Sequence, residues 1–214
     1  MLRYIVTIIV LYTSVLPSSF SIARVKYNGG GDWYSDPTSI KNLLNYFEKS
    51  TGISCENDEK VTEISEEEIF NYPYLYLTGH GKVELNDNEL KILRKHLLNG
   101  GFLHADDNYG MDNSFREVVK KLFPKKELVK VPFSHPIYNI KYKFPNGVPK
   151  IHKHDGKPPV GYGIFHNERL ILFYSYESDL GDGWEDIEVH NNPQPLREKA
   201  LKMGTNLILY FLNS

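Results

Sequence analysis

The stretch NDNELKILRKHLLNGGFLHADD, residues 86–107, carries the signals that decide the fold. Asn86 followed by Glu89 resembles a capping box, in which each side chain binds the backbone N–H of the other residue at the start of a helix. Leucines at helical spacing follow and are expected to face the core, namely Leu90, Leu93, Leu97 and Leu98. The glycine pair at 100–101 ends the helix before an apolar run at 102–105. A helix that leads directly into a short buried strand indicates a parallel α/β unit.

Segments on both sides repeat this alternation of helix and strand. Residues 24–27 are expected to form a first strand, and residues 74–78 a central one. Two more segments place apolar residues at helical spacing, namely Ile40, Leu43, Leu44 and Phe47 before Gly52, and Phe115, Val118, Val119 and Leu122 before Pro124. We therefore expect a three-layer α/β protein built on a mainly parallel, doubly wound, flavodoxin-like sheet.

The C-terminal half departs from this alternation. Periodicity fades over residues 132–159, a stretch rich in Pro, Gly, His and Lys. Long irregular insertions in compact domains usually carry function or are mobile. Apolar runs at 163–165 and 170–174 then predict a hairpin that turns at residues 167–168, and a final helix is expected from about Leu196.

The composition indicates one globular domain and excludes some classes of partner. A chain of 214 residues suits a single core. The formal net charge is -2 and the charges are interspersed, so nucleic acid is not an expected partner. Cys55 is the only cysteine, so no intrachain disulfide can form and the stability of the domain must come from its core.

The first residues resemble a secretory signal peptide. Arg3 precedes an apolar run at 4–15, and small residues follow before Arg24. The run is shorter than the roughly 20 residues that span a bilayer, which favours cleavage over a retained anchor. The mature protein would then be exported, to the periplasm or the extracellular space.

The expected organisation is a signal peptide over 1–23 and a single α/β domain over 24–214. Cleavage after Ser21 or after Ala23 satisfies the requirement for a small residue at the cleavage site. After cleavage no transmembrane segment is expected.

Unusual polar and aromatic residues gather where the expected strands end. In a parallel sheet the carboxyl ends of the strands meet at one rim, where ligands usually bind. The residues that follow these ends are Asp32, Trp33, His80, Asp106, Asp107, Asp179, Asp182 and Trp184. Proteins hold sugar rings with a tryptophan face beside carboxylates, so the set predicts a site for a carbohydrate or another small molecule. The two tryptophans could equally anchor their loops to the core, and the acidic segment 179–186 could be a solvated loop.

A divalent metal is the cofactor that these residue types would hold. The adjacent carboxylates of Asp106 and Asp107 repel each other unless a cation, a shared proton or hydrogen-bond donors offset the charge. Carboxylate oxygens suit calcium or magnesium, whereas histidines suit zinc. The predicted metal ligands are His80, Asp106, Asp107, His135, His152 and His154. Their spacing matches no standard ligand signature, and helix capping by the aspartates or backbone hydrogen bonding by the histidines is the alternative role.

The motifs also carry a family resemblance. They are GGGDW at 29–33, YPYLYLTGHG at 72–81, GGFLHADD at 100–107 and SDLGDGW at 178–184. Together they resemble the uncharacterised bacterial family called domain of unknown function 4159. That family resembles the class I glutamine amidotransferase-like fold, and LLNGGFLH at 97–104 is similar to the trehalose-utilisation group within it. The resemblance implies a fold more than it implies a reaction.

Amidotransferase chemistry does not follow from this resemblance. Such enzymes place a nucleophilic cysteine on a sharp turn after a central strand, and here Asp106 and Asp107 stand at that turn while Cys55 lies elsewhere. The sequence also lacks the Gly-x-Ser-x-Gly elbow of serine hydrolases.

Two functions therefore remain open. The chain could be a non-catalytic module of the cell envelope that binds a carbohydrate or an envelope protein. It could instead be a metal-assisted hydrolase, in which Asp106, Asp107 and one or more of His80, His135, His152 and His154 hold an ion that activates water. The lack of a known catalytic spacing favours the binding module.

Overall fold

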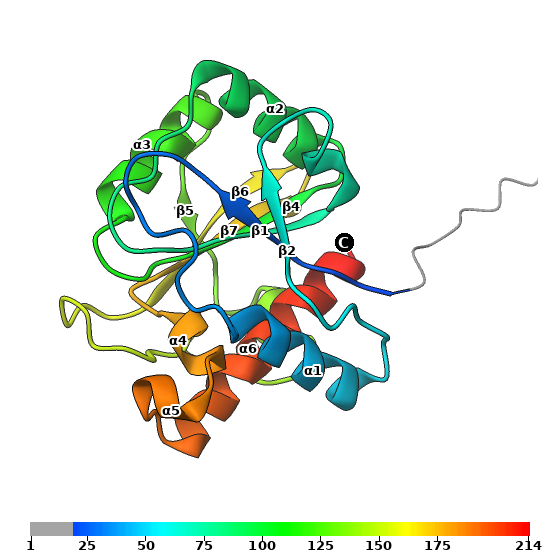
Figure 1. Cartoon of the computed structure of the whole chain (residues 1–214), viewed down its shortest axis with the longest axis vertical. Helices are drawn as coiled ribbons and strands as arrows, with labels where there is room; N and C mark the ends of the chain where they lie inside the picture. Colours follow the sequence, from blue (N-terminus) through cyan, green and yellow to red (C-terminus); the bar gives the residue numbers. More distant parts are fainter. Residues whose placement is uncertain (1–18) are drawn as a thin grey trace, which may run out of the picture.

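A seven-stranded sheet lies between two layers of helices in this computed structural model, which describes residues 19–214 (Figure 1). The strands are β1 (Ala23–Lys26), β2 (Lys60–Glu63), β3 (Tyr74–Leu77), β4 (Phe102–Asp106), β5 (Val129–Lys130), β6 (Val160–His166) and β7 (Arg169–Tyr176). Their order across the sheet is β2-β1-β3-β4-β7-β6-β5. The expected α/β class with a mainly parallel sheet is thereby confirmed.

The sheet is mixed because β6 runs opposite to the other strands. The first five strands in the order above are parallel to one another, whereas β6 pairs antiparallel with β7 and β5 pairs antiparallel with β6. β6 and β7 form the expected hairpin. Its turn residues Asn167 and Glu168 have φ values of 47° and 65°, as the tightest hairpin turns require.

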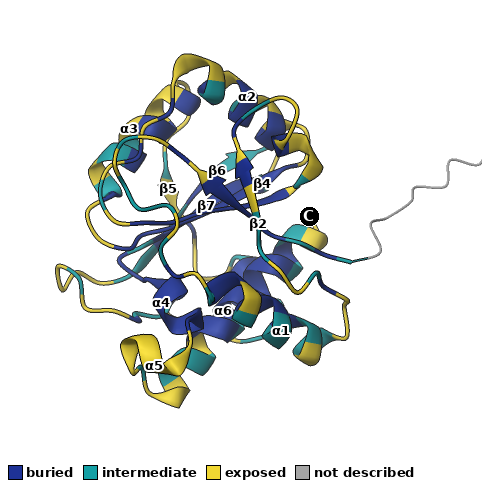
Figure 2. Cartoon of the chain, viewed as in Figure 1, coloured by how far each residue is buried: buried dark blue, intermediate teal, exposed yellow. Residues whose placement is uncertain are grey.

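Helices cover both faces of the sheet (Figure 1). On one face lie α1 (Ser39–Thr51), α4 (Leu180–Trp184) and α6 (Gln194–Leu212), and the short α5 (Ile187–His190) links α4 to α6. On the other face lie α2 (Asp87–Leu98) and α3 (Asp112–Leu122). Two short 3₁₀ turns are η1 (Ile69–Asn71) and η2 (Pro136–Tyr138). The buried residues of these helices, drawn dark blue in Figure 2, pack in the cores on the two faces of the sheet.

The strands contribute to a separate core on each face of the sheet. In β3, Tyr74 and Tyr76 point into the core beneath α1, α4 and α6, while Leu75 and Leu77 point into the core beneath α2 and α3. All four residues are buried, as expected for a central strand of a parallel sheet. The sheet is therefore buried on both of its faces.

Local signals in the sequence correctly located the helix ends. The side chain of Asn86 accepts hydrogen bonds from the backbone N–H groups of Asn88 and Glu89, and Glu89 accepts one from Asn86 at 2.7 Å. Gly52 ends α1 with a φ of 77°, a left-handed conformation that glycine adopts without strain. Leu98, expected in the core, is instead 39% exposed at the end of α2.

Elements without an apolar signal were not expected from the sequence. β2 reads Lys-Val-Thr-Glu and exists because it pairs in parallel with β1. The acidic segment 179–186 is not a solvated loop, because it contains α4, whose residues are all buried. Residues 132–159 are irregular as expected, and η2 is the helical turn within them.

The predicted signal peptide lies mostly outside the described residues, which begin at Ser19. From there the chain is packed against the domain. The ring of Phe20 lies 5.9 Å from that of Phe47 and 5.8 Å from that of Tyr74, measured between centroids. Within residues 19–214, no helix is both long enough and apolar enough to cross a membrane.

Candidate functional site

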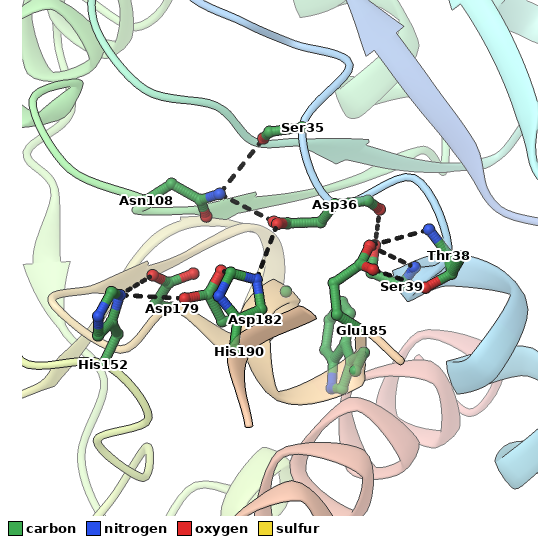
Figure 3. Close-up of polar contacts among 12 residues, drawn as sticks. Ser35, Asp36, Thr38, Ser39, Asn108, His152, Asp179, Asp182, Glu185 and His190 are labelled. Atoms are coloured by element: carbon green, nitrogen blue, oxygen red, sulfur yellow. Dashed lines mark hydrogen bonds and ion pairs between the residues drawn. The ribbon is translucent and has the colours of Figure 1, made fainter. Parts of the chain in front are cut away.

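The strand ends bring several loops together at one rim of the sheet. β1, β3, β4 and β7 are parallel, so the residues that follow them converge at their carboxyl ends. Asp36 comes from the loop after β1, Asn108 follows β4, and Asp179 follows β7. His152, from the irregular segment, reaches the same place (Figure 3).

Two histidines and an aspartate form a first triad at this rim. Nε2 of His154 lies 2.7 Å from Oδ2 of Asp179, and Nδ1 of His152 lies 3.5 Å from the same oxygen. One potential ligand atom from each residue falls within 4.8 Å of the others. Oδ1 of Asp179 is buried and has no hydrogen-bond partner among the described residues. This combination of imidazole and carboxylate suits zinc or another transition ion.

A second triad of the same type lies beside the first. It consists of Asp36, Asp182 and His190, whose potential ligand atoms also fall within 4.8 Å of one another. Nε2 of His190 lies 3.2 Å from Oδ1 of Asp182 and 3.9 Å from Oδ1 of Asp36. The other oxygen of Asp182, Oδ2, lies 3.0 Å from Nδ1 of His152 in the first triad. Asp182 is therefore a member of the second triad whose carboxylate also contacts His152 of the first (Figure 3).

The crowding of carboxylates perturbs their protonation. Burial raises the pKa of Asp182 far above its usual range, and the negative charges of Asp179 and Asp36 raise it further. Burial and the charge of Asp179 likewise raise the pKa of Asp36 to about 6. Burial opposes ionisation of Asp179 too, but the hydrogen bonds from His152 and His154 outweigh burial and lower its pKa. Buried carboxylates this close need a cation or a shared proton to offset their repulsion.

Arg24 and Asn108 hold Asp36 in place. The buried guanidinium of Arg24 donates to the backbone oxygens of Ser35 and Asp36 at 2.5 and 2.9 Å, and it pairs with Glu59. Nδ2 of Asn108 donates to Oδ2 of Asp36 at 2.8 Å. These contacts fix a residue whose φ of 56° is uncommon outside glycine, which marks a constrained loop.

Asp106 connects β4 to α4, which carries Asp182. It is fully buried, and its oxygens accept hydrogen bonds from Ser175 Oγ at 2.5 Å, the Gly181 N–H at 2.7 Å and the Tyr76 hydroxyl at 3.2 Å. A Cβ at Gly181 would lie 2.5 Å from Oδ2 of Asp36, so only glycine fits this close approach. Burial and the charge of Asp179 raise the pKa of Asp106 to about 7. Because its oxygens face protein donors, Asp106 positions the site rather than facing a ligand.

Asp107 faces a cavity next to the first triad. Its Oδ2 accepts a hydrogen bond from the Glu177 N–H at 3.1 Å, while its Oδ1 is buried without a partner among the described residues. The cavity has a volume of about 210 Å³ and is lined by Asp107, Tyr109, Gly110, Asp112, Asn113, His154, Asp155, Lys157, Tyr176 and Glu177. A small polar substrate group bound there would lie beside His154.

Some predicted site residues lie on the same rim without joining either triad. His80 pairs with Asp32, with its Nδ1 3.1 Å from Asp32 Oδ2, and the His80 side chain is 51% exposed. Trp33 is half-buried against the core beneath α2 and α3. His80 and Asp32 therefore form an exposed pair, and Trp33 serves as a packing contact.

Two other predicted site residues are used by the scaffold. Trp184 is 1% exposed, and its ring centroid lies 5.6 Å from that of Tyr76 and 5.8 Å from that of His104. It therefore presents no face to a sugar in solvent. His135 accepts a hydrogen bond from the Ile137 N–H at the start of η2, and its ring packs 5.0 Å from that of Tyr210.

Two site residues were missed by the sequence analysis. Asp36 lies several residues beyond the end of β1, and His190 lies in a short helix without an apolar pattern. Neither residue stands in a recognisable motif. The Gly-Asp-Gly run that contains Asp182 was the signal that correctly pointed to the segment of α4.

The chain was compared with known proteins. A search of curated proteins found no match to it. Residues 21–212 match the family described as Domain of unknown function (DUF4159), which covers nearly all of the described chain. The expected family resemblance is thereby confirmed, and the protein belongs to this DUF4159 family.

Proposed function

We propose that this protein is a metal-assisted hydrolase in which His152, His154 and Asp179 hold a divalent ion. The observation that carries the proposal is the first triad. Its three potential ligand atoms lie within 4.8 Å of one another, and the buried Oδ1 of Asp179 has no hydrogen-bond partner among the described residues. Of the two functions that the sequence left open, this geometry supports the hydrolase better than the binding module.

The residues around the triad support hydrolysis. A divalent ion in such a site lowers the pKa of a water molecule. Asp107 lines the cavity that His154 also lines, and its Oδ1 has no partner among the described residues. Burial raises the pKa of Asp107 to about 6, a value that suits a general base near neutral pH. Asp107 is therefore the residue that we assign to accept a proton from the attacking water.

The strand order supports a narrower fold placement. The parallel strands run β2-β1-β3-β4-β7, which is the 2-1-3-4-5 order of a flavodoxin-like sheet. This order supports the proposed class I glutamine amidotransferase-like fold. Thiol chemistry has no support, because burial raises the pKa of Cys55 to about 11 and Cys55 lies next to Phe20, away from the strand ends of the site.

One observation favours binding of a carbohydrate as a second candidate function. Tyr109 is 55% exposed and lines the same cavity as three aspartates, an arrangement in which a ring can stack on a sugar while carboxylates accept from its hydroxyls. If a sugar binds there, Tyr109→Ala should weaken its binding about tenfold without a change in the melting temperature. Calorimetric titration with a panel of mono- and disaccharides tests this.

The hydrolase is tested by removing first-triad ligands and measuring both metal content and activity. His154→Ala and Asp179→Asn should lose zinc in elemental analysis and lose hydrolysis of a panel of ester, amide and phosphoester substrates. His80→Ala is the matched control, because it removes an exposed histidine of the same rim that belongs to neither triad. Activity that survives both chelation and His154→Ala would reject the proposal.

A further inference from the structure

We propose that a second divalent ion binds at Asp36, Asp182 and His190, with Asp182 bridging it to the first ion. This inference extends the proposed function, which needs the first site alone. The second triad presents one ligand atom from each residue within 4.8 Å of the other two, from three separate segments of the chain.

The orientation of Asp182 is the main evidence for a bridge. Its carboxylate divides its oxygens between the triads, with Oδ2 3.0 Å from His152 Nδ1 and Oδ1 3.2 Å from His190 Nε2. The ring centroids of His152 and His190 lie 6.4 Å apart, so the two imidazoles approach different oxygens of the Asp182 carboxylate (Figure 3). Paired ions in hydrolytic sites are typically about 3.5–4 Å apart, a separation that one bridging carboxylate spans.

The charge balance also favours two ions. Asp36, Asp179 and Asp182 are buried, and among residues 19–214 their ion-pair partners are histidines and no lysine or arginine. Histidines that bind a metal are neutral, so they would leave the charges of three buried carboxylates without a cation to offset them. One divalent ion leaves that site negative, whereas two ions leave a single positive charge that a hydroxide or an anionic substrate group offsets.

The second triad is held in position and remains open to solvent. Asn108 fixes Asp36, and the Asn192 side chain donates to the backbone oxygen of Asp182 at 3.2 Å. The side chain of His190 is 29% exposed, which provides a route for an ion from solvent. A site whose ligands are already placed loses little conformational entropy when it binds.

The experiment counts ions in the metal-free full chain after titration with zinc. Calorimetry and elemental analysis should give two ions per chain for the wild type and for the His80→Ala control. His190→Ala should retain one ion, and so should His154→Ala, because each removes a ligand from a different triad. A wild-type stoichiometry of one that His190→Ala leaves unchanged would overturn the second site.

Manganese provides a test of the bridge that is independent of affinity. Two Mn²⁺ ions joined by the Asp182 carboxylate should give an exchange-coupled electron paramagnetic resonance spectrum. Asp182→Asn, which removes one bridging oxygen with little change in shape, should convert it to the six-line spectrum of isolated ions. Six lines in the fully loaded wild type would exclude the bridge.

These measurements can reject either ion site independently of the other. If His154→Ala leaves the ion count unchanged while His190→Ala lowers it, the first-site proposal fails and the second ion site remains. The opposite pattern removes the second site and leaves the hydrolase proposal intact. Circular dichroism of each variant confirms that the ion was lost from a folded chain.

Discussion

Glu185 joins the end of α4 to the start of α1 through Thr38. The Glu185 carboxylate accepts hydrogen bonds from the Thr38 backbone N–H at 2.8 Å and from its hydroxyl at 2.6 Å, and a third from the Ser39 N–H at 3.2 Å. A residue far along the chain thus takes the place of a local helix cap. The same contact holds the loop of Asp36 against the segment that carries Asp182.

Removal of this contact should destabilise the protein and weaken metal binding together. Glu185→Ala removes the hydrogen-bond partner of the Thr38 N–H and of the Thr38 hydroxyl, while the Ser39 N–H keeps the Asp36 backbone oxygen at 3.1 Å. The variant should therefore lower the free energy of unfolding by about 1–3 kcal/mol. Urea unfolding measures the loss. Thr38→Val, combined with Glu185→Ala in a double-mutant cycle, should show coupling of about 1 kcal/mol. Strictly additive losses would mean that the two side chains do not act together.

Asp106 and Asp107 should respond differently to substitution by asparagine. Asp106→Asn places an amide NH₂ against donors from Ser175, Gly181 or Tyr76, so it should lower the free energy of unfolding by about 1–3 kcal/mol. Asp107→Asn should leave stability within about 1 kcal/mol and lower hydrolysis at least tenfold, because a neutral amide does not take up a proton. Melting and activity measurements on both single variants separate the roles. Equal destabilisation would place both residues in the scaffold.

His104 should make the protein less stable in acid. It is fully buried between Tyr76 and Phe173, and burial lowers its pKa from 6.5 to about 3. Between these values the unfolded chain binds a proton that the folded chain excludes, so the free energy of unfolding falls as the pH falls below 6.5. The contribution is up to about 1.4 kcal/mol per pH unit.

The variant His104→Gln isolates this contribution from that of other groups. Asp106 acts in the opposite direction, because its raised pKa favours the folded state in acid. The difference between wild type and His104→Gln cancels such shared contributions. His104→Gln should be less stable than wild type at pH 7.5, and the deficit should shrink steadily towards pH 4.5 in urea unfolding experiments. A deficit that is constant with pH would show that His104 takes up a proton in the folded state.

Export should produce a mature chain that begins at Ile22. Of the two predicted cleavage positions, the one after Ser21 removes the buried Phe20 but keeps Ile22, which is also buried, and all of β1. Cleavage after Ala23 would remove both Ile22 and the first residue of the strand. N-terminal sequencing of protein purified from the native envelope measures the position. An intact Met1 would indicate a retained segment instead of a cleaved signal.

The sequence alone determined the features that depend on neighbours along the chain. The Asn86–Glu89 capping box, the left-handed Gly52 and the turn at Asn167 act over a few residues, so their side chains and backbone preferences are visible without a fold. The alternation of apolar runs also determined the parallel sheet, which in turn placed the loops after β3, β4 and β7 at one rim. β2 was not predicted because three of its four residues are polar or charged, and it forms a strand because it pairs with β1.

The tertiary structure alone decided which rim residues meet. His190 and Asp36 stand in no shared pattern. His190 contacts both Asp36 and Asp182 once α4, which carries Asp182, has packed against α1 and α6. The same packing directs Trp184 into the core and leaves His80 with Asp32 at the surface. A sequence records which side chains follow each strand. The direction in which each side chain points depends on contacts between residues far apart in the chain. These contacts form only when the helices pack on the sheet.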